Sequence, residues 1–137
     1  MTPYARGCAV LVAMSCAVAA LSGAARAEPA PESYVDACAG CHGPDARGGG
    51  PKAAMLSVTV PDLTTLAARN GGTFDAVRVI RLIDGREGLS AHGGPMPMFG
   101  GLLTGRSAVI DGPDGSPVMT TEPILDIVMW LEMLQEP

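Results

Sequence analysis

The stretch that decides the fold is Cys38-Ala39-Gly40-Cys41-His42, in which two thiols stand three positions apart and a histidine follows directly. On about one helical turn both thiols reach the same edge of a flat ring, and the histidine is carried beneath that ring. This spacing is the C-x-x-C-H pattern of covalent haem attachment. We therefore predict that Cys38 and Cys41 form thioethers with the vinyl groups of one haem c, and that His42 binds its iron.

Three other interpretations of the cysteine pair fit the sequence less well. A disulfide at this spacing is strained and gives His42 no role. A thioredoxin-like redox pair needs alternating strands and helices around it, and the flanking sequence does not show them. A structural zinc ion needs four ligands, whereas the chain beyond residue 27 offers this motif and His92 without a second close pair. Haem attachment accounts for every residue of the motif.

Residues 1–27 have the pattern of an export signal. Arg6 precedes the run Cys8–Leu21, which is apolar except for Ser15, and Ala25-Arg26-Ala27 places small residues where signal peptidase reads them. We predict cleavage after Ala27, which leaves residues 28–137 as one haem domain in the periplasm. The apolar run is shorter than the roughly 18 residues of a membrane-spanning helix, so we expect no stable membrane insertion.

Composition and net charge indicate which classes of partner and cofactor the chain can bind. The chain has 137 residues and a net charge of −5, and the predicted cleavage removes two of its nine basic residues but none of its fourteen acidic ones. The resulting charge of −7 argues against nucleic acid, which requires clustered Lys and Arg. The remaining domain of 110 residues buries only about two-thirds of its unfolded surface, so a bound haem would supply much of its core. We expect a monomer whose partners are redox proteins.

The second axial ligand of the iron must come from further along the chain. Met129 and Met133 fall within the pattern of a C-terminal helix and are expected in its core, and the stretch around Met55 is expected to line the pocket. The segment 93–101, Gly-Gly-Pro-Met-Pro-Met-Phe-Gly-Gly, is instead an irregular loop able to hold one sulfur against the iron. Its candidates are Met96 and Met98, and His92 beside it is a further one.

The attachment motif together with the run Met96–Gly101 resembles the small mono-haem c-type cytochromes with His/Met ligation. The resemblance implies that the ligand is Met96, the methionine directly before Pro97. It also implies that Tyr34 packs against Trp130 across the N- and C-terminal helices. Pro51 resembles the proline whose carbonyl accepts a hydrogen bond from the histidine ligand, a contact that orients the ring.

Apolar periodicity and capping residues independently predict an all-α architecture, with several helices wrapped around one haem. The expected helices are Glu32–Cys38, Leu63–Asn70 after an Asp62 N-cap, Thr73–Ile83 ending at Gly85, and Thr121–Gln135 with Ile124, Ile127, Val128 and Leu131 on one face. The segment Gly105–Thr121 is longer than its counterpart in the shortest family members. It is either a small hairpin, with strands at 108–110 and 117–119, or a plain loop.

A haem with both axial positions filled by protein leaves no open site for oxygen or peroxide, so we expect single-electron transfer and no enzymatic activity. A methionine ligand raises the reduction potential. Two alternatives stay open: a gas sensor that releases its methionine, and a dedicated haem subunit of a larger dehydrogenase or oxidase complex. The segment Gly88–Gly105 carries no charged residue when His92 is neutral, which suits a small contact surface for brief encounters.

Overall fold

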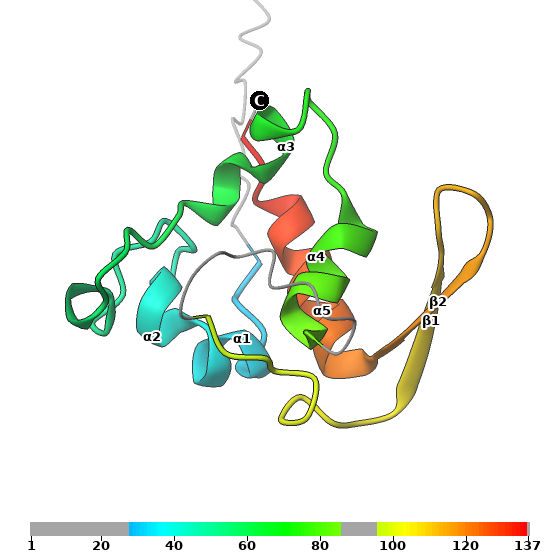
Figure 1. The fold of residues 1–137 in the computed structure, drawn as a ribbon, viewed down its shortest axis with the longest axis horizontal. Coiled ribbons are helices and arrows are strands. Elements are labelled where there is room, and N and C mark those ends of the chain that lie inside the picture. The colour runs from blue at the N-terminus through cyan, green and yellow to red at the C-terminus, as the bar shows by residue number, and fades with distance from the viewer. Residues whose placement is uncertain (1–27, 86–95, 137) are drawn as a thin grey trace, which may run out of the picture.

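The computed structural model describes residues 28–85 and 96–136. The helices pack together and a hairpin projects to the side (Figure 1). In chain order the elements are α1 (Glu32–Ala37), α2 (Ala39–His42), the 3-10 turns η1 (Ala53–Met55) and η2 (Leu63–Thr65), α3 (Leu66–Arg69), α4 (Ala76–Asp84), β1 (Ser107–Asp111), β2 (Pro117–Thr121) and α5 (Glu122–Met133). No helix within these two ranges is both long and apolar enough to cross a bilayer. The predicted signal peptide, residues 1–27, and His92 lie outside the described residues.

The attachment motif is itself helical. The predicted helix Glu32–Cys38 is found as α1, and Cys38 joins it to the single turn of α2. The Cys38 carbonyl accepts hydrogen bonds from Cys41 N at 3.1 Å and His42 N at 2.9 Å. The spacing of the motif thus places both cysteines and the histidine around one turn.

Side-chain caps explain where two further helices begin. Asp62 Oδ1 accepts from Thr64 N at 2.8 Å, as predicted, although the helix starts as the 3-10 turn η2 before it becomes α3. The helix predicted from Thr73 begins instead at Ala76, because Asp75 Oδ1 accepts from Arg78 N at 2.9 Å. Gly85 ends α4 in the left-handed conformation, with φ of +68°, as expected of a glycine at that position.

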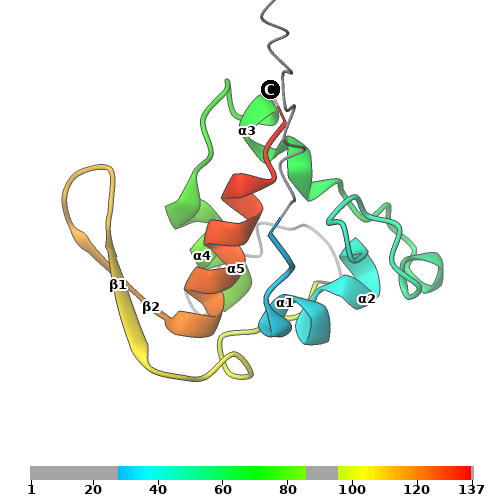
Figure 2. The same ribbon diagram turned by 180° about the vertical axis from the view of Figure 1, so that it is seen from behind.

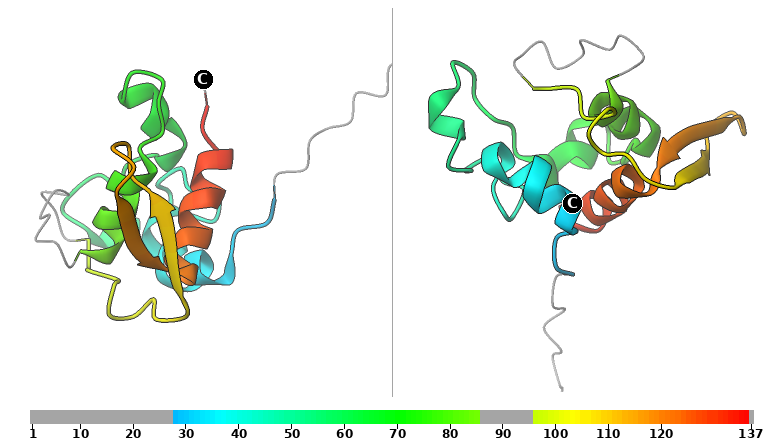
Figure 3. Two further views of the ribbon diagram at one scale, coloured as in Figure 1. Left: turned by 90° about the vertical axis from the view of Figure 1, so that its right-hand side faces the viewer. Right: turned by 90° about the horizontal axis from the view of Figure 1, so that it is seen from below.

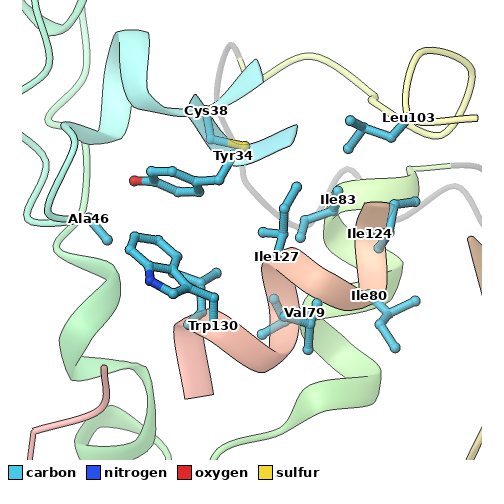
Figure 4. Packing of buried hydrophobic residues seen from close by; sticks show 12 residues of the cluster. Tyr34, Cys38, Ala46, Val79, Ile80, Ile83, Leu103, Ile124, Ile127 and Trp130 are labelled. Carbon is cyan, nitrogen blue, oxygen red and sulfur yellow. The ribbon is translucent and has the colours of Figure 1, made fainter. Parts of the chain in front are cut away.

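The core lies where α1, α4 and α5 meet, and α4 and α5 run side by side (Figures 2 and 4). Tyr34 and Trp130 face each other with ring centroids 4.5 Å apart and planes tilted by 51°, which confirms the predicted pair. The predicted apolar face of α5 is also confirmed, since Ile124, Ile127, Val128 and Leu131 are all buried.

The expectation that the two methionines of α5 lie in the core is wrong. Met129 is 56% exposed and Met133 is 62% exposed. They lie four positions apart, on the face of the helix that also carries the exposed Asp126. Because residues at this spacing share one side of a helix, the packing of Trp130 and Ile127 inward turns both methionines to solvent.

The segment between the methionine loop and α5 is a hairpin, which adds two strands to the predicted all-α fold. The strands β1 and β2 are antiparallel and pair from Ser107 with Thr121 to Asp111 with Pro117. One face, formed by Ala108, Ile110, Val118 and Thr120, is shielded where the hairpin contacts α4 and α5. The other face is exposed, and the far end of the hairpin extends away from the helices (Figures 1 and 3).

The chain after α5 is tied back to η2 and α3. Gln135 Oε1 accepts from Ala67 N at 2.8 Å, and its Nε2 donates to Leu63 O at 2.9 Å. These bonds hold the segment that carries Leu63 and Leu66 against the end of α5. Both leucines line the cavity described next.

Candidate haem-binding site

A cavity of about 390 Å³ opens between α1, α2, the segment 56–66, α4, the loop after residue 95 and α5. Its walls are largely apolar, with contributions from Leu82, Ile83, Phe99, Ile127 and Leu131 among others. All three chemically distinctive residues of the attachment motif, Cys38, Cys41 and His42, line it. Met96, in the described range 96–136, lines the same cavity.

The turn that carries the motif is braced by the segment that follows it. Gly48 N donates to His42 O at 2.8 Å, Gly50 N donates to Cys41 O at 3.1 Å, and Lys52 N donates to Gly40 O at 2.7 Å. A Cβ on Gly50 would lie 2.5 Å from Gly40 O, so only glycine allows this approach. The segment 48–52 therefore lies directly against α2.

Pro51 stands within this segment, between two residues that are bonded to α2. Its ring is exposed, and it is not part of the cavity wall. The predicted hydrogen bond from the His42 ring to the Pro51 carbonyl stays a prediction.

Tyr34 braces the other side of the motif. Its hydroxyl donates to Gly43 O at 2.7 Å, and Gly43, with φ of +79°, ends α2 directly after His42. Burial raises the pKa of Tyr34 above its ordinary value, with smaller contributions from Cys38 and Asp45. The phenol is therefore a fixed donor at neutral pH, a role that the aromatic pairing predicted from sequence did not include.

The two cysteines are free of a disulfide. Burial, followed by the influence of Cys41, raises the pKa of the Cys38 thiol to about 11. The Cys38 thiol is thus a buried group at the wall of the cavity. In residues 28–85 and 96–136 no three His, Cys, Asp or Glu side chains gather as a metal site.

Among the described methionines, Met96 is the one that lines the cavity. Its side chain is half-buried and packs against the core. Met98 is 70% exposed, and its side chain lies beside Gly85 instead. Met55 is 82% exposed, although its neighbours Leu56 and Val58 do line the cavity, as expected of that stretch.

The family model of cytochrome c matches residues 27–134 of the chain. The chain belongs to the cytochrome c family. This c-type cytochrome is accordingly an electron-transfer protein with covalently bound haem c and its iron, built on a helical haem-binding fold. No curated protein and no solved structure matches the chain.

The cavity of this cytochrome fits a haem in chemical character. Apolar side chains suit the porphyrin faces, and two thiols, an imidazole and a thioether reach the same space. Within the described part of the chain, Arg69 is the one lining residue that is always charged. Its Nη2 donates to Asp62 O at 2.5 Å and its Nε donates to Thr65 O at 3.3 Å, so the guanidinium is held at the wall. Its remaining N–H groups would suit the carboxylate groups of a haem. No sequence pattern pointed to Arg69.

Proposed function

We propose that this cytochrome carries single electrons between redox proteins through one haem. In this proposal Cys38 and Cys41 would attach the haem, and His42 and Met96 would bind its iron. The observation that carries the proposal is that a single apolar cavity collects the attachment motif and one methionine from a distant loop. A single haem is supported by the single C-x-x-C-H motif in the chain.

Each residue has a separate task in this arrangement. When bound, the haem supplies an iron that alternates between the ferric and ferrous states. The thioether of Met96 favours the ferrous state and so raises the reduction potential. Pro51, through its carbonyl, holds the orientation of the His42 ring. With His42 and Met96 both holding the iron, no position would be open to a substrate, and we propose that the cytochrome has no substrate chemistry of its own.

The assignment of the sixth ligand is tested by Met96→Leu with Met98→Leu as the matched control. We expect Met98→Leu to keep a ferrous haem that does not bind carbon monoxide, and to keep the weak long-wavelength band of thioether-bound ferric iron. Met96→Leu should lose that band, bind carbon monoxide and fall in potential. The reverse pattern would assign the ligand to Met98, and a wild-type protein that lacks the band and does not bind carbon monoxide would direct attention to His92.

Carbon monoxide binding and copurification decide between electron transfer and the two alternatives. A wild-type protein that binds carbon monoxide rapidly at neutral pH would favour a gas sensor over an electron carrier. Copurification with one partner that persists at high salt would favour a fixed subunit of a dehydrogenase or oxidase complex. A free carrier should instead elute as a monomer and exchange electrons with more than one redox protein.

We also propose that the protein is exported and matured in the periplasm. The proposal is supported by the sequence pattern of residues 1–27, and attachment of haem c to an exported chain is consistent with it. Mass spectrometry of the matured protein should give a chain that starts at Glu28 plus the mass of one haem. Retention of Met1 together with membrane association would contradict export in soluble form.

A further inference from the structure

The loop that carries Met96 is attached to the C-terminal end of α4. Phe99 N donates to Ile83 O at 2.9 Å, and Gly100 N donates to Asp84 O at 3.0 Å. The last carbonyls of a helix have no partner within the helix, so these two bonds use acceptors that α4 leaves open. Met96 stands three residues before the first of them.

Gly100 is buried at this attachment and has no space for a side chain. A Cβ there would lie 1.9 Å from Asp84 Oδ1 and 2.5 Å from Asp84 O. The carbonyl belongs to the backbone of α4 and cannot move without the helix. Since real Cβ atoms essentially never approach another atom within 3.0 Å, any side chain at this position must push the loop away from α4 by about half an ångström.

The loop is held on its other side as well. Phe99 O accepts from Leu102 N and Leu103 N, both at 2.8 Å. Leu103 is buried in the core, and its carbonyl accepts from Thr121 Oγ1 at 2.7 Å. The loop is therefore fixed between α4 and the end of β2, and a displacement at Gly100 cannot be absorbed by free movement of the segment that follows.

We propose that Gly100 is a positioning residue for the axial methionine: its close approach to the end of α4 sets the place of the Met96 side chain at the haem. The inference rests on the proposed ligation by Met96. Phe99, which lines the cavity and donates to α4, connects the two. A thioether is a weak axial ligand, so a shift of the loop should loosen its bond to iron before it unfolds the protein.

Gly101 offers a matched control, because a Cβ there meets no atom within 4 Å and neither glycine has a positive φ. In the full-length matured cytochrome, we expect Gly100→Ala to weaken the long-wavelength thioether band and lower the reduction potential. The rate of carbon monoxide binding to the ferrous form should rise by roughly tenfold or more. Gly101→Ala should match wild type in all three measurements.

Retention of the band by Gly100→Ala, with no carbon monoxide binding, would overturn the inference while leaving ligation by Met96 intact. A wild-type protein that lacks the band would overturn the ligation and the inference together. If Gly100→Ala yields no matured protein, Thr121→Val removes the bond to Leu103 O from the other side of the loop. That variant should also bind carbon monoxide several-fold faster than wild type, and an unchanged rate would refute the positioning role.

Discussion

Replacement of Tyr34 by Phe removes one hydroxyl and leaves the aromatic packing in place. The ring is fully buried and lies 4.5 Å from the ring of Trp130 (Figure 4). A Phe ring keeps this contact, so the loss is confined to the hydrogen bond from the hydroxyl to Gly43 O at 2.7 Å. Because Gly43 ends the turn that carries His42, the variant measures how strongly that turn is anchored.

The expected cost follows from the partners of the Gly43 carbonyl. A buried hydrogen bond contributes about 0.5–1.5 kcal/mol, and an acceptor left with no partner costs about 1–3 kcal/mol. Gly43 O keeps a second donor, Ala46 N at 3.3 Å, so we expect the free energy of unfolding to fall by about 1 kcal/mol. For a domain of this size that lowers Tm by roughly 4 °C. Tyr34→Ala also removes the ring and should cost about 3–5 kcal/mol.

Urea unfolding of the matured protein measures both values. Trp130 is the one tryptophan in the chain, and its fluorescence should rise as unfolding carries it away from the haem. A loss for Tyr34→Phe as large as that for Tyr34→Ala would show that the hydroxyl, not the ring, dominates. Unchanged stability of Tyr34→Phe would show that the bond to Gly43 contributes nothing.

Three further predictions concern the same site. Gly50→Ala should lower the free energy of unfolding in urea by about 1–3 kcal/mol, because the new Cβ would meet the backbone of α2. The control Gly49→Ala, at a position with open space around it, should unfold like wild type. Arg69→Gln should lower the reduction potential by up to roughly 60 mV, the one-electron equivalent of a tenfold change, while voltammetry of Arg78→Gln, on the exposed side of α4, should show no shift. Burial raises the pKa of the Tyr34 phenol, so the stability that Tyr34 contributes is present below the ordinary phenol pKa of about 10 and is lost as pH rises toward the folded-state value. In unfolding experiments Tyr34→Phe should not show this loss of stability at alkaline pH. An equal loss in both proteins would contradict the prediction.

Capping residues and helix-ending glycines close to each helix predicted the helices well. Asp62 caps η2 and Gly85 ends α4, as expected, because caps depend on hydrogen bonds and dihedral angles within a few residues. The start at Thr73 is wrong because Asp75, two residues later, is the residue whose side chain accepts the bond from Arg78 N. A pattern of short apolar runs around a turn did not decide between hairpin and loop, and the hairpin forms where Ile110 and Val118 pack against the core.

The sequence by itself determined the attachment motif and the identity of the helices, since the spacing of residues along a helix sets which side chains share a turn or a face. The aromatic pair was implied by the resemblance to c-type cytochromes. Only the tertiary structure decided which apolar residues are inside. It turns Met129 and Met133 outward and places Met96, rather than Met98, at the cavity. It also shows that Gly50 and Gly100 are required by close approach to backbone atoms and not by their dihedral angles. The reason is physical: burial and free space depend on elements that are distant in the chain and meet only on folding, and no local spacing records where they meet.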